Sequence, residues 1–486
     1  MISKLVRSLL ATMVLLLLLV VIGAAFIGFR LLTYEVSGDT DHLAEKASYL
    51  EAISDSSPAS AIAPNVVLIL FDDLGYGDLG IYGAQNLATP NIDRVARNGV
   101  RFNQYYAPSP YCTPSRAALL TGRYAPRTGL PFVVAPSNSA IDVLYRVLGF
   151  NTRLPRGEIT LAEVLQSAGY ATAAIGKWHL GDRKPSLPND FGFDHFFGLH
   201  YSNDMTPLAL WRDRQQIEPS PADQTTLSAR YTDEVLEFLL KNQDKPSFVY
   251  LPHTFPHIPL HASAAQSGRS NAGLYGDVIA DLDDSVGRIM EAIENSPIER
   301  DTIVMITSDN GPWFQGSPGP LRGRKNDVLE GGFRVPFVAW WSRQALQGRV
   351  IDTPAMGIDV FPTVLELVGI PLPDDRLIDG VSLAPLLTGN DVDDDRALFY
   401  FKGETALAVR NRGYKYLERQ PVAGGIPFNL PLMPLFDKGP WLFDMAADES
   451  ESFNIISRRS KMASHLADLL GAINSEMETN PRGWRE

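Results

Sequence analysis

The sequence has a single cysteine, Cys112, and no excess of basic residues. One cysteine cannot form an intrachain disulfide, so an exported form of this chain must be held together by core packing or by a bound metal. Aspartate and glutamate total 56 against 43 lysines and arginines, which gives a net charge of −13. Because a nucleic-acid-binding protein needs a basic surface to neutralise phosphates, and no basic cluster occurs, we exclude that class.

The sequence also lacks internal repeats and the composition of a disordered chain. Hydrophobic residues make up 45% of its 486 residues and charged residues 20%. A chain with this apolar content folds around a core. Its length suits two or three domains, or one large α/β unit with an appendage.

A long uncharged run lies near the N-terminus. Residues 8–29 contain no charged side chain, and an apolar helix of about 20 residues crosses a bilayer core. A signal peptide usually has a shorter apolar region before its cleavage site, so we expect residues 1–30 to be an uncleaved signal anchor rather than a signal peptide. Lys4 and Arg7 precede the run, which puts the N-terminus inside. The sequence therefore predicts an exported, membrane-anchored protein whose main part is extracytoplasmic (periplasmic, extracellular or lumenal).

Short apolar runs alternate with helical patterns along the rest of the chain. The runs occupy residues 65–71, 171–175, 247–251 and 302–307. Each is bounded by turn-forming residues, as is typical of a strand buried on both faces. Helical spacing of apolar residues follows in 275–293. This alternation predicts an α/β fold with a large, mostly parallel sheet sandwiched by helices.

The residue composition and pattern of the sequence change at two points. Residues 31–63 mix charged and small residues and are interpreted as a tether. Residues 64–396 carry the α/β pattern. From residue 397 short aromatic runs precede an amphipathic segment near 460–473, so 397–486 are predicted to form a small antiparallel-sheet subdomain with a helix.

Polar side chains cluster just after the predicted strands. They are Asp72, Asp73, Lys177, His179, His253 or His257, Asp309 and Asn310. Ligands of open α/β sheets bind outside the carboxyl ends of the strands. Adjacent carboxylates repel one another unless a cation compensates, and an all-oxygen donor set suits one Ca²⁺ ion before Mg²⁺. A single Asp-Asp-Leu-Gly is more often a turn, but two such pairs on separate strands favour a metal site.

A second feature is the segment from Cys112 to Arg116. Thr113 as N-cap and Pro114 as the first helical residue would put Cys112 at a helix N-terminus. Backbone N–H groups there favour an anion, and Arg116 can add a charge-assisted contact. The alternative is a buried structural cysteine in front of a capped helix.

The pattern Cys-Thr-Pro-Ser-Arg followed by Leu-Thr-Gly resembles the sulfatase signature. The likeness extends to residues 176–181, to 307–312 and to Lys325 ahead of Glu330, and it is similar to the arylsulfatase A and galactosamine-6-sulfatase types. It implies an alkaline phosphatase-like fold and a catalytic domain in 64–396. It also implies that a formylglycine-generating enzyme converts Cys112 to formylglycine (3-oxoalanine), whose hydrated aldehyde is the nucleophile.

The resemblance implies a role for each residue of the predicted site. The Ca²⁺ ligands would be Asp72, Asp73, the modified Cys112, Asp309 and Asn310. Arg116 and Lys177 would stabilise the hydrated aldehyde, and His179 would take its second proton. His257, which matches the family pattern better than His253, would bind the sulfate with Lys325 and help protonate the leaving oxygen. Lys177 and Ser202 would also contact the sulfate.

Two other functions remain open. The nearest is a phosphonate monoester or phosphodiester hydrolase of the same superfamily, although Asp309 followed by Asn310, rather than by histidine, favours sulfate. The other is an inactive, membrane-tethered binding relative. The presence of a suitable residue at every expected catalytic position argues against this alternative. We expect a sulfated small molecule or carbohydrate as substrate, selected by rim loops in 133–158, 211–226 and 420–438. The last of these is Pro-rich and apolar and would form a lip over the pocket or touch the membrane.

Overall fold

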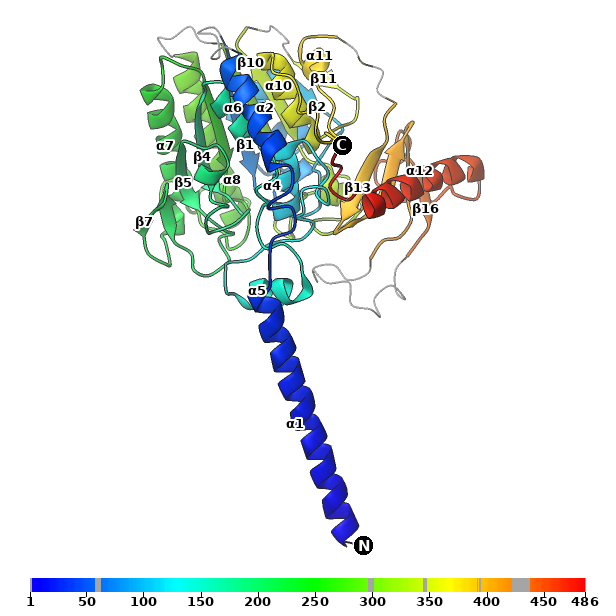
Figure 1. The fold of residues 1–486 in the computed structure, drawn as a ribbon. Coiled ribbons are helices and arrows are strands. Elements are labelled where there is room, and N and C mark those ends of the chain that lie inside the picture. Colours follow the sequence, from blue (N-terminus) through cyan, green and yellow to red (C-terminus); the bar gives the residue numbers. More distant parts are fainter. Residues whose placement is uncertain are drawn as a thin grey trace.

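The computed structural model describes residues 2–56, 63–295, 301–343, 348–390, 392, 395–421 and 438–485. Residues 422–437, most of the third predicted rim loop, lie outside this description. Helix α1 (Ile2–Leu32) projects alone from the globular part (Figure 1). Its residues Val6–Leu32 are long and apolar enough to cross a membrane and are not buried by the rest of the chain.

A ten-stranded sheet forms the centre of the described structure, in the order β11-β2-β10-β9-β1-β8-β4-β5-β6-β7. Its central strands are β1 (Asn65–Phe71), β4 (Ala171–Lys177), β5 (His195–Leu199), β8 (Ser247–Pro252) and β9 (Thr302–Ser308). These five pair in parallel. The edges are mixed: β2 (Val100–Phe102), β10 (Phe337–Trp341) and β11 (Arg349–Ile351) flank β9, and β6 (Leu210–Arg212) and β7 (Gln215–Glu218) follow β5. The predicted mostly parallel sheet is confirmed.

Strand β1 is buried on both faces because its side chains alternate between two cores. Val66, Leu68 and Leu70 pack into one hydrophobic cluster. Val67, Ile69 and Phe71 pack into the other. Since successive side chains of a strand point to opposite faces, helices must cover both sides of the sheet. Figure 1 shows this layered arrangement.

The helices divide between the two faces. The second cluster is built with α3 (Pro90–Asn98), α7 (Leu227–Lys241) and α8 (Gly273–Glu294). The first is built with α2 (Leu43–Asp55), α4 (Cys112–Thr121), α6 (Leu161–Ser167), α10 (Val360–Val368) and α11 (Ala384–Leu387). The remaining elements include α5 (Ala140–Leu148), α9 (Glu330–Phe333) and the paired strands β3 (Tyr105–Tyr106) and β12 (Ala355–Met356).

The C-terminal part forms a separate antiparallel sheet, as predicted. It contains β13 (Leu398–Lys402), β14 (Thr405–Asn411), β15 (Tyr414–Leu417) and β16 (Trp441–Asp444) in that order. Helix α12 (Ser460–Thr479) packs on it with Leu466 and Leu470. Buried Lys415 of β15 forms an ion pair with Glu330 of α9 at 3.1 Å, which links this sheet to the main domain.

Part of the predicted tether is attached to the α/β domain. Helix α2 lies within residues 31–63, and Ile53 on it is buried in the first core. Lys46 pairs with Glu163 of α6 at 2.6 Å. The chain between α1 and β1 is therefore partly packed against the domain that follows it, while the domain boundaries themselves stay predictions.

The start of α4 differs from the prediction. The helix begins at Cys112 with Tyr111 as its N-cap, so the prediction of Thr113 as N-cap was wrong. Thr113 instead donates a hydrogen bond from its hydroxyl to the carbonyl of His179 at 3.1 Å. The side chain joins α4 to the loop after β4, and this tertiary contact replaces the local capping bond that the sequence suggested.

Candidate active site

The predicted site residues meet at the carboxyl ends of the central strands. Asp72 and Asp73 directly follow β1, Lys177 ends β4, and Asp309 follows β9. Cys112 is the first residue of α4, and all five are buried or nearly so. Because β4, β1 and β9 run parallel with only β8 between them, residues more than two hundred positions apart in the sequence share one pocket.

The Cys112 thiol lies inside this pocket. Its Sγ is 3.3 Å from Asp72 Oδ1 and 3.4 Å from Lys325 Nζ. Burial, and next the charge of Asp72, raise the pKa of the thiol well above its usual value. Because the thiolate is the nucleophilic form of cysteine, the unmodified side chain is poorly suited to attack a substrate here.

Three carboxylates face three cations around the thiol. Arg116 donates from Nε and Nη2 to Asp309 Oδ2 at 2.9 and 2.8 Å, and its Nη2 lies 3.2 Å from Asp72. Lys177 pairs with Asp72, and Lys325 pairs with Asp73 at 2.7 Å. Buried charges require such compensation, since an unpaired one carries a large desolvation cost.

The carboxylates titrate unequally. Burial alone would raise the pKa of Asp72, but Lys177 and the other cations outweigh it and hold that pKa below its usual value. Burial and the charge of Asp72 raise the pKa of Asp309 to about 6 despite its contact with Arg116. The pKa of Asp309 therefore stays raised although each of the three carboxylates has a cation partner, and an added metal ion would relieve this repulsion.

Asn310 supplies the clearest sign of a cation site. Its Nδ2 donates to Asp73 Oδ1 at 2.7 Å and to the Gly311 carbonyl at 2.9 Å, which fixes the orientation of the amide. Its Oδ1 is buried and accepts no hydrogen bond from any residue that the structure describes. A buried amide oxygen normally has a partner, so this one is available to ligate a cation.

One ligand atom from each of four residues lies within 4.8 Å of the others: Asp72, Asp73, Cys112 and His257. Asp309 contacts the same group through the backbone N–H of Asp73, which donates to its Oδ1 at 3.3 Å. The all-oxygen part of the set fits a hard cation, and His257 is the one nitrogen donor within reach in the described part of the chain.

Two site residues have left-handed backbone conformations. Asp73 has φ of +70° and His179 has φ of +62°, values that non-glycine residues adopt at a cost. At Gly176, with φ of +130°, a Cβ atom would lie 1.9 Å from the Pro252 carbonyl oxygen, so only glycine lets β4 approach β8 here. Strain of this kind persists where the surrounding structure fixes the positions of functional side chains.

His179 is held as a neutral base. Its Nε2 lies 3.0 Å from the carbonyl of Val134, which can only accept, so the proton is assigned to Nε2. Burial, and then the charges of Lys177 and Arg116, lower the pKa of the ring well below its usual value. The buried Nδ1 has no partner among the described residues and so carries a free lone pair.

His257, not His253, lies at the charged cluster. Its Nε2 is 3.8 Å from Asp73 Oδ2, and its Nδ1 lies 2.6 Å from its neighbour's carbonyl at Ile258. His253 instead stacks on Phe71 and is not part of the metal-ligating group. Ser202 accepts a hydrogen bond from Lys177 Nζ at 3.0 Å, so the serine does reach the site.

Two positioning residues were not recognised from the sequence. Asn203 has its Oδ1 3.1 Å from His257 Nδ1, and it donates to the Pro259 carbonyl at 3.0 Å. Val134 binds His179 through its backbone. Asn203 sits next to the predicted Ser202, which could have drawn attention to it, whereas a backbone contact such as that of Val134 leaves no signal in the sequence.

The family follows from comparison with known proteins. A sequence model of sulfatases matches residues 64–370, the whole stretch that supplies these side chains. The chain belongs to the sulfatase family.

Curated relatives agree with this assignment. N-acetylgalactosamine-6-sulfatase of Canis lupus familiaris is 38% identical over 375 residues, covering 72% of this chain and 71% of that protein. The Homo sapiens enzyme of that name is 34% identical and covers 85% and 86%. Arylsulfatase A of Bos taurus is 34% identical and covers 83% and 86%. This sulfatase is therefore a sulfuric ester hydrolase.

Solved structures show the same fold. A sulfatase described with the metabolism of multiple glycosaminoglycans by Bacteroides thetaiotaomicron has a TM-score of 0.75 at 27% identity, covering 85% of this chain and all of that one. A sulfatase from Pseudoalteromonas sp. has a TM-score of 0.75 at 25% identity, with coverage of 91% and 95%. A phosphonate monoester hydrolase of Agrobacterium radiobacter, at TM-score 0.57 and 20% identity with coverage of 85% and 96%, shares the alkaline phosphatase-like fold.

The geometry of His179 leads to a first prediction. We expect His179→Ala to lower kcat for sulfate ester hydrolysis about 10²- to 10⁴-fold, because a positioned base contributes that much. The matched control is His195→Gln. His195 is the first residue of β5, at the end of the strand away from the site, and it contacts Glu234 at 2.7 Å. Initial rates of sulfate release measure both. Equal kcat values for His179→Ala and the wild type would contradict a proton-transfer role.

Proposed function

We propose that the chain hydrolyses sulfate esters to an alcohol and inorganic sulfate by means of a formylglycine made from Cys112 and one bound Ca²⁺ ion. The observation that supports this most is the convergence of a buried thiol, three carboxylates and a partnerless amide oxygen on one pocket. A formylglycine-generating enzyme is then a required partner during maturation.

Asp72, Asp73, Asp309, Asn310 and the modified Cys112 would hold the ion. When bound, Ca²⁺ supplies positive charge that neutralises the sulfate oxygens and acidifies the hydrated aldehyde. Mg²⁺ is a poorer candidate because it demands a near-ideal octahedral set of ligands. With three carboxylates already matched by three cations, a divalent ion gives the pocket a positive excess, which attracts an anionic ester into an otherwise acidic protein.

The chain's own residues would then orient the ester and move protons. Lys177 and Lys325 each have an ammonium group at the cluster that can turn from a carboxylate to a sulfate oxygen. Arg116 is fixed by Asp309 and by the Lys177 carbonyl, so its charge stays oriented. His179 would accept the second proton of the hydrated aldehyde at Nδ1, the atom that has no partner among the described residues.

His257 would donate a proton to the leaving oxygen from Nε2. Burial, and next the charge of Lys325, lower the pKa of His257 in the free enzyme. An anionic ester bound beside Lys325 would offset that charge and raise the pKa again, which favours the protonated form when substrate is present.

A sulfated carbohydrate is the substrate class that we propose. A cavity of about 360 Å³ is lined by Lys325 of the charged cluster together with Trp313, Phe314 and Arg324. Phe314 is 70% exposed and packs edge-to-face on Trp313 at 4.9 Å between ring centroids. An exposed aromatic face beside a sulfate-binding lysine suits a sugar ring with polar edges and apolar faces. The names of the relatives, N-acetylgalactosamine-6-sulfatase among them, support this choice.

We place the catalytic domain outside the cytoplasm, anchored by α1. The helix has the length and composition of a span, and basic residues precede it.

The reaction is tested with sulfated sugars, aryl sulfates and aryl phosphate diesters supplied to the full-length protein from its native host. We expect release of inorganic sulfate to be the faster reaction, and Cys112→Ala to abolish it because the nucleophile is lost. Faster cleavage of the phosphate diester would favour the phosphodiesterase alternative. If the mass of the peptide containing residue 112 corresponds to an unmodified thiol, and no ester is cleaved, the chain is the inactive binding relative.

The aromatic platform gives a separate prediction. Phe314→Ala should raise KM for a sulfated sugar about 5- to 10-fold and leave kcat unchanged, because the ring binds the leaving group without contacting the sulfate. Phe453→Ala is the matched control, since Phe453 is 73% exposed and lies in the C-terminal subdomain. An unchanged KM for sugar and aryl substrates alike would place the leaving group elsewhere.

A further inference from the structure

Helix α5 has an unpartnered apolar side. Ile141, Leu144 and Leu148 are 39%, 40% and 52% exposed. Their spacing of three and four residues places them in one stripe along a helix. The flank of the stripe is anchored, since Tyr145, four residues after Ile141, is 1% exposed and packs edge-on against Phe150 at 5.8 Å. The stripe therefore points out of a helix that is itself firmly seated.

The last turn of α1 is attached to α5. Arg30 donates from Nε to the carbonyl of Val147, in the last turn of α5, at 2.9 Å. Gly149 ends α5 with φ of +86°, and a Cβ there would lie 2.7 Å from Arg30 Nη2, so glycine makes room for the guanidinium. Figure 1 shows α5 lying across the end of α1 at the foot of the globular part.

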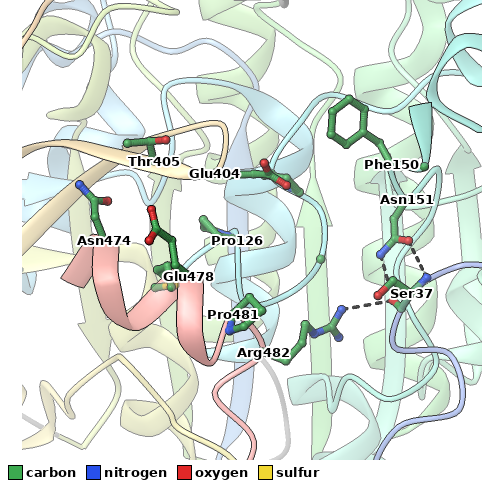
Figure 2. Close-up of a pocket in the computed structure, with 14 residues that line it drawn as sticks. Ser37, Pro126, Phe150, Asn151, Glu404, Thr405, Asn474, Glu478, Pro481 and Arg482 are labelled. Atoms are coloured by element: carbon green, nitrogen blue, oxygen red, sulfur yellow. Dashed lines mark hydrogen bonds between the residues drawn. The ribbon is translucent and has the colours of Figure 1, made fainter. Parts of the chain in front are cut away.

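The segment after α1 is fixed to the same region, so this arrangement is not a loose joint. Tyr34 donates to the Phe150 carbonyl at 3.1 Å. Ser37 and Asn151 exchange two hydrogen bonds of 2.8 and 3.0 Å, and Arg482 donates to the Ser37 carbonyl at 3.3 Å (Figure 2). These contacts border a cavity of about 630 Å³. The position of α5 relative to α1 is therefore set by the fold.

Geometry then gives the depth of α5 relative to a bilayer. Val6–Leu32 comprises 27 residues, which at 1.5 Å per residue is about 40 Å of helix. The hydrocarbon core is only about 30 Å thick, so the ends of the span extend into the headgroup layers. Arg30 belongs in that layer because its guanidinium reaches the polar interface. The helix bonded to Arg30 lies at the same depth.

We propose that α5 is an interfacial helix that inserts Ile141, Leu144 and Leu148 into the outer leaflet of the membrane that α1 spans. The inference rests on the proposed anchoring by α1. A helix that exposes an apolar stripe at headgroup level can bind a lipid surface in the plane of the interface. Two attachments, α1 and α5, would limit the tilt of the domain relative to the bilayer more than α1 alone.

Docking of α5 also places the active site. Val134, whose carbonyl binds His179, precedes the first residue of α5 by six positions. Six residues span at most about 21 Å of extended chain. The catalytic histidine is thereby held a short distance from the lipid surface, where it can reach sulfate esters displayed on that surface.

The test uses the full-length chain, one copy per lipid nanodisc, in a Cys112→Ala background that leaves a single engineered thiol. Leu144→Cys carries an environment-sensitive fluorophore, and the matched control is Leu240→Cys, at a residue 68% exposed near the end of α7. We expect blue-shifted emission at position 144 and strong quenching by nitroxide-labelled lipid, with neither change at position 240. Ile141→Ser combined with Leu148→Ser should reduce both signals at position 144.

The other outcomes distinguish anchoring by α1 from insertion of α5 into the membrane. Release of the wild-type chain from native membranes by alkaline carbonate contradicts anchoring by α1, and this proposal falls with it. Retention of the chain with identical spectra at positions 144 and 240 contradicts only the insertion of α5. A blue shift at position 144 without quenching by lipid means that protein covers the stripe, which also overturns insertion.

Discussion

The compensation of buried negative charge is the constraint on which this structure depends. Asp72, Asp73 and Asp309 are buried at the ends of the adjacent strands β1 and β9. Without a partner, the charge of each would carry a large desolvation cost. Arg116 and two lysines balance them, yet the pKa of Asp309 stays raised to about 6 and the Asn310 oxygen has no described partner. A divalent cation would resolve both features at once, and in the proposed function its charge would serve the chemistry.

The sheet is the reason that these groups can meet. Parallel strands buried on both faces end at one edge, so residues following β1, β4 and β9 converge without any local sequence relationship. The same rigidity supports the left-handed backbone of Asp73 and His179. Stable packing below the site thus allows strain and charge within it.

The sequence predicted this core well because continuous apolar runs between turn residues have few structural solutions. The site residues, in contrast, were predicted from the resemblance of the segment around Cys112 to the sulfatase signature. Prediction failed where a tertiary contact overrode a local one: Thr113 binds the loop after β4 rather than capping its helix. Helix α2 was predicted to be part of a tether because Ile53 and Lys46 attach it to the domain through residues that are far away in the sequence. The contact of Asn203 with His257 likewise exists only after folding.

The central claim is that one hard cation binds where the three carboxylates meet. Equilibrium dialysis with radioactive Ca²⁺ measures this directly on the full-length protein and on Asp73→Ala and Asn310→Ala, with Asp395→Ala, at an exposed ion pair with Arg412, as the control. The account predicts one ion per chain for the wild type and the control, and at least tenfold weaker binding for the two site variants. Binding of equal strength in all four proteins, or none in the wild type, would contradict it.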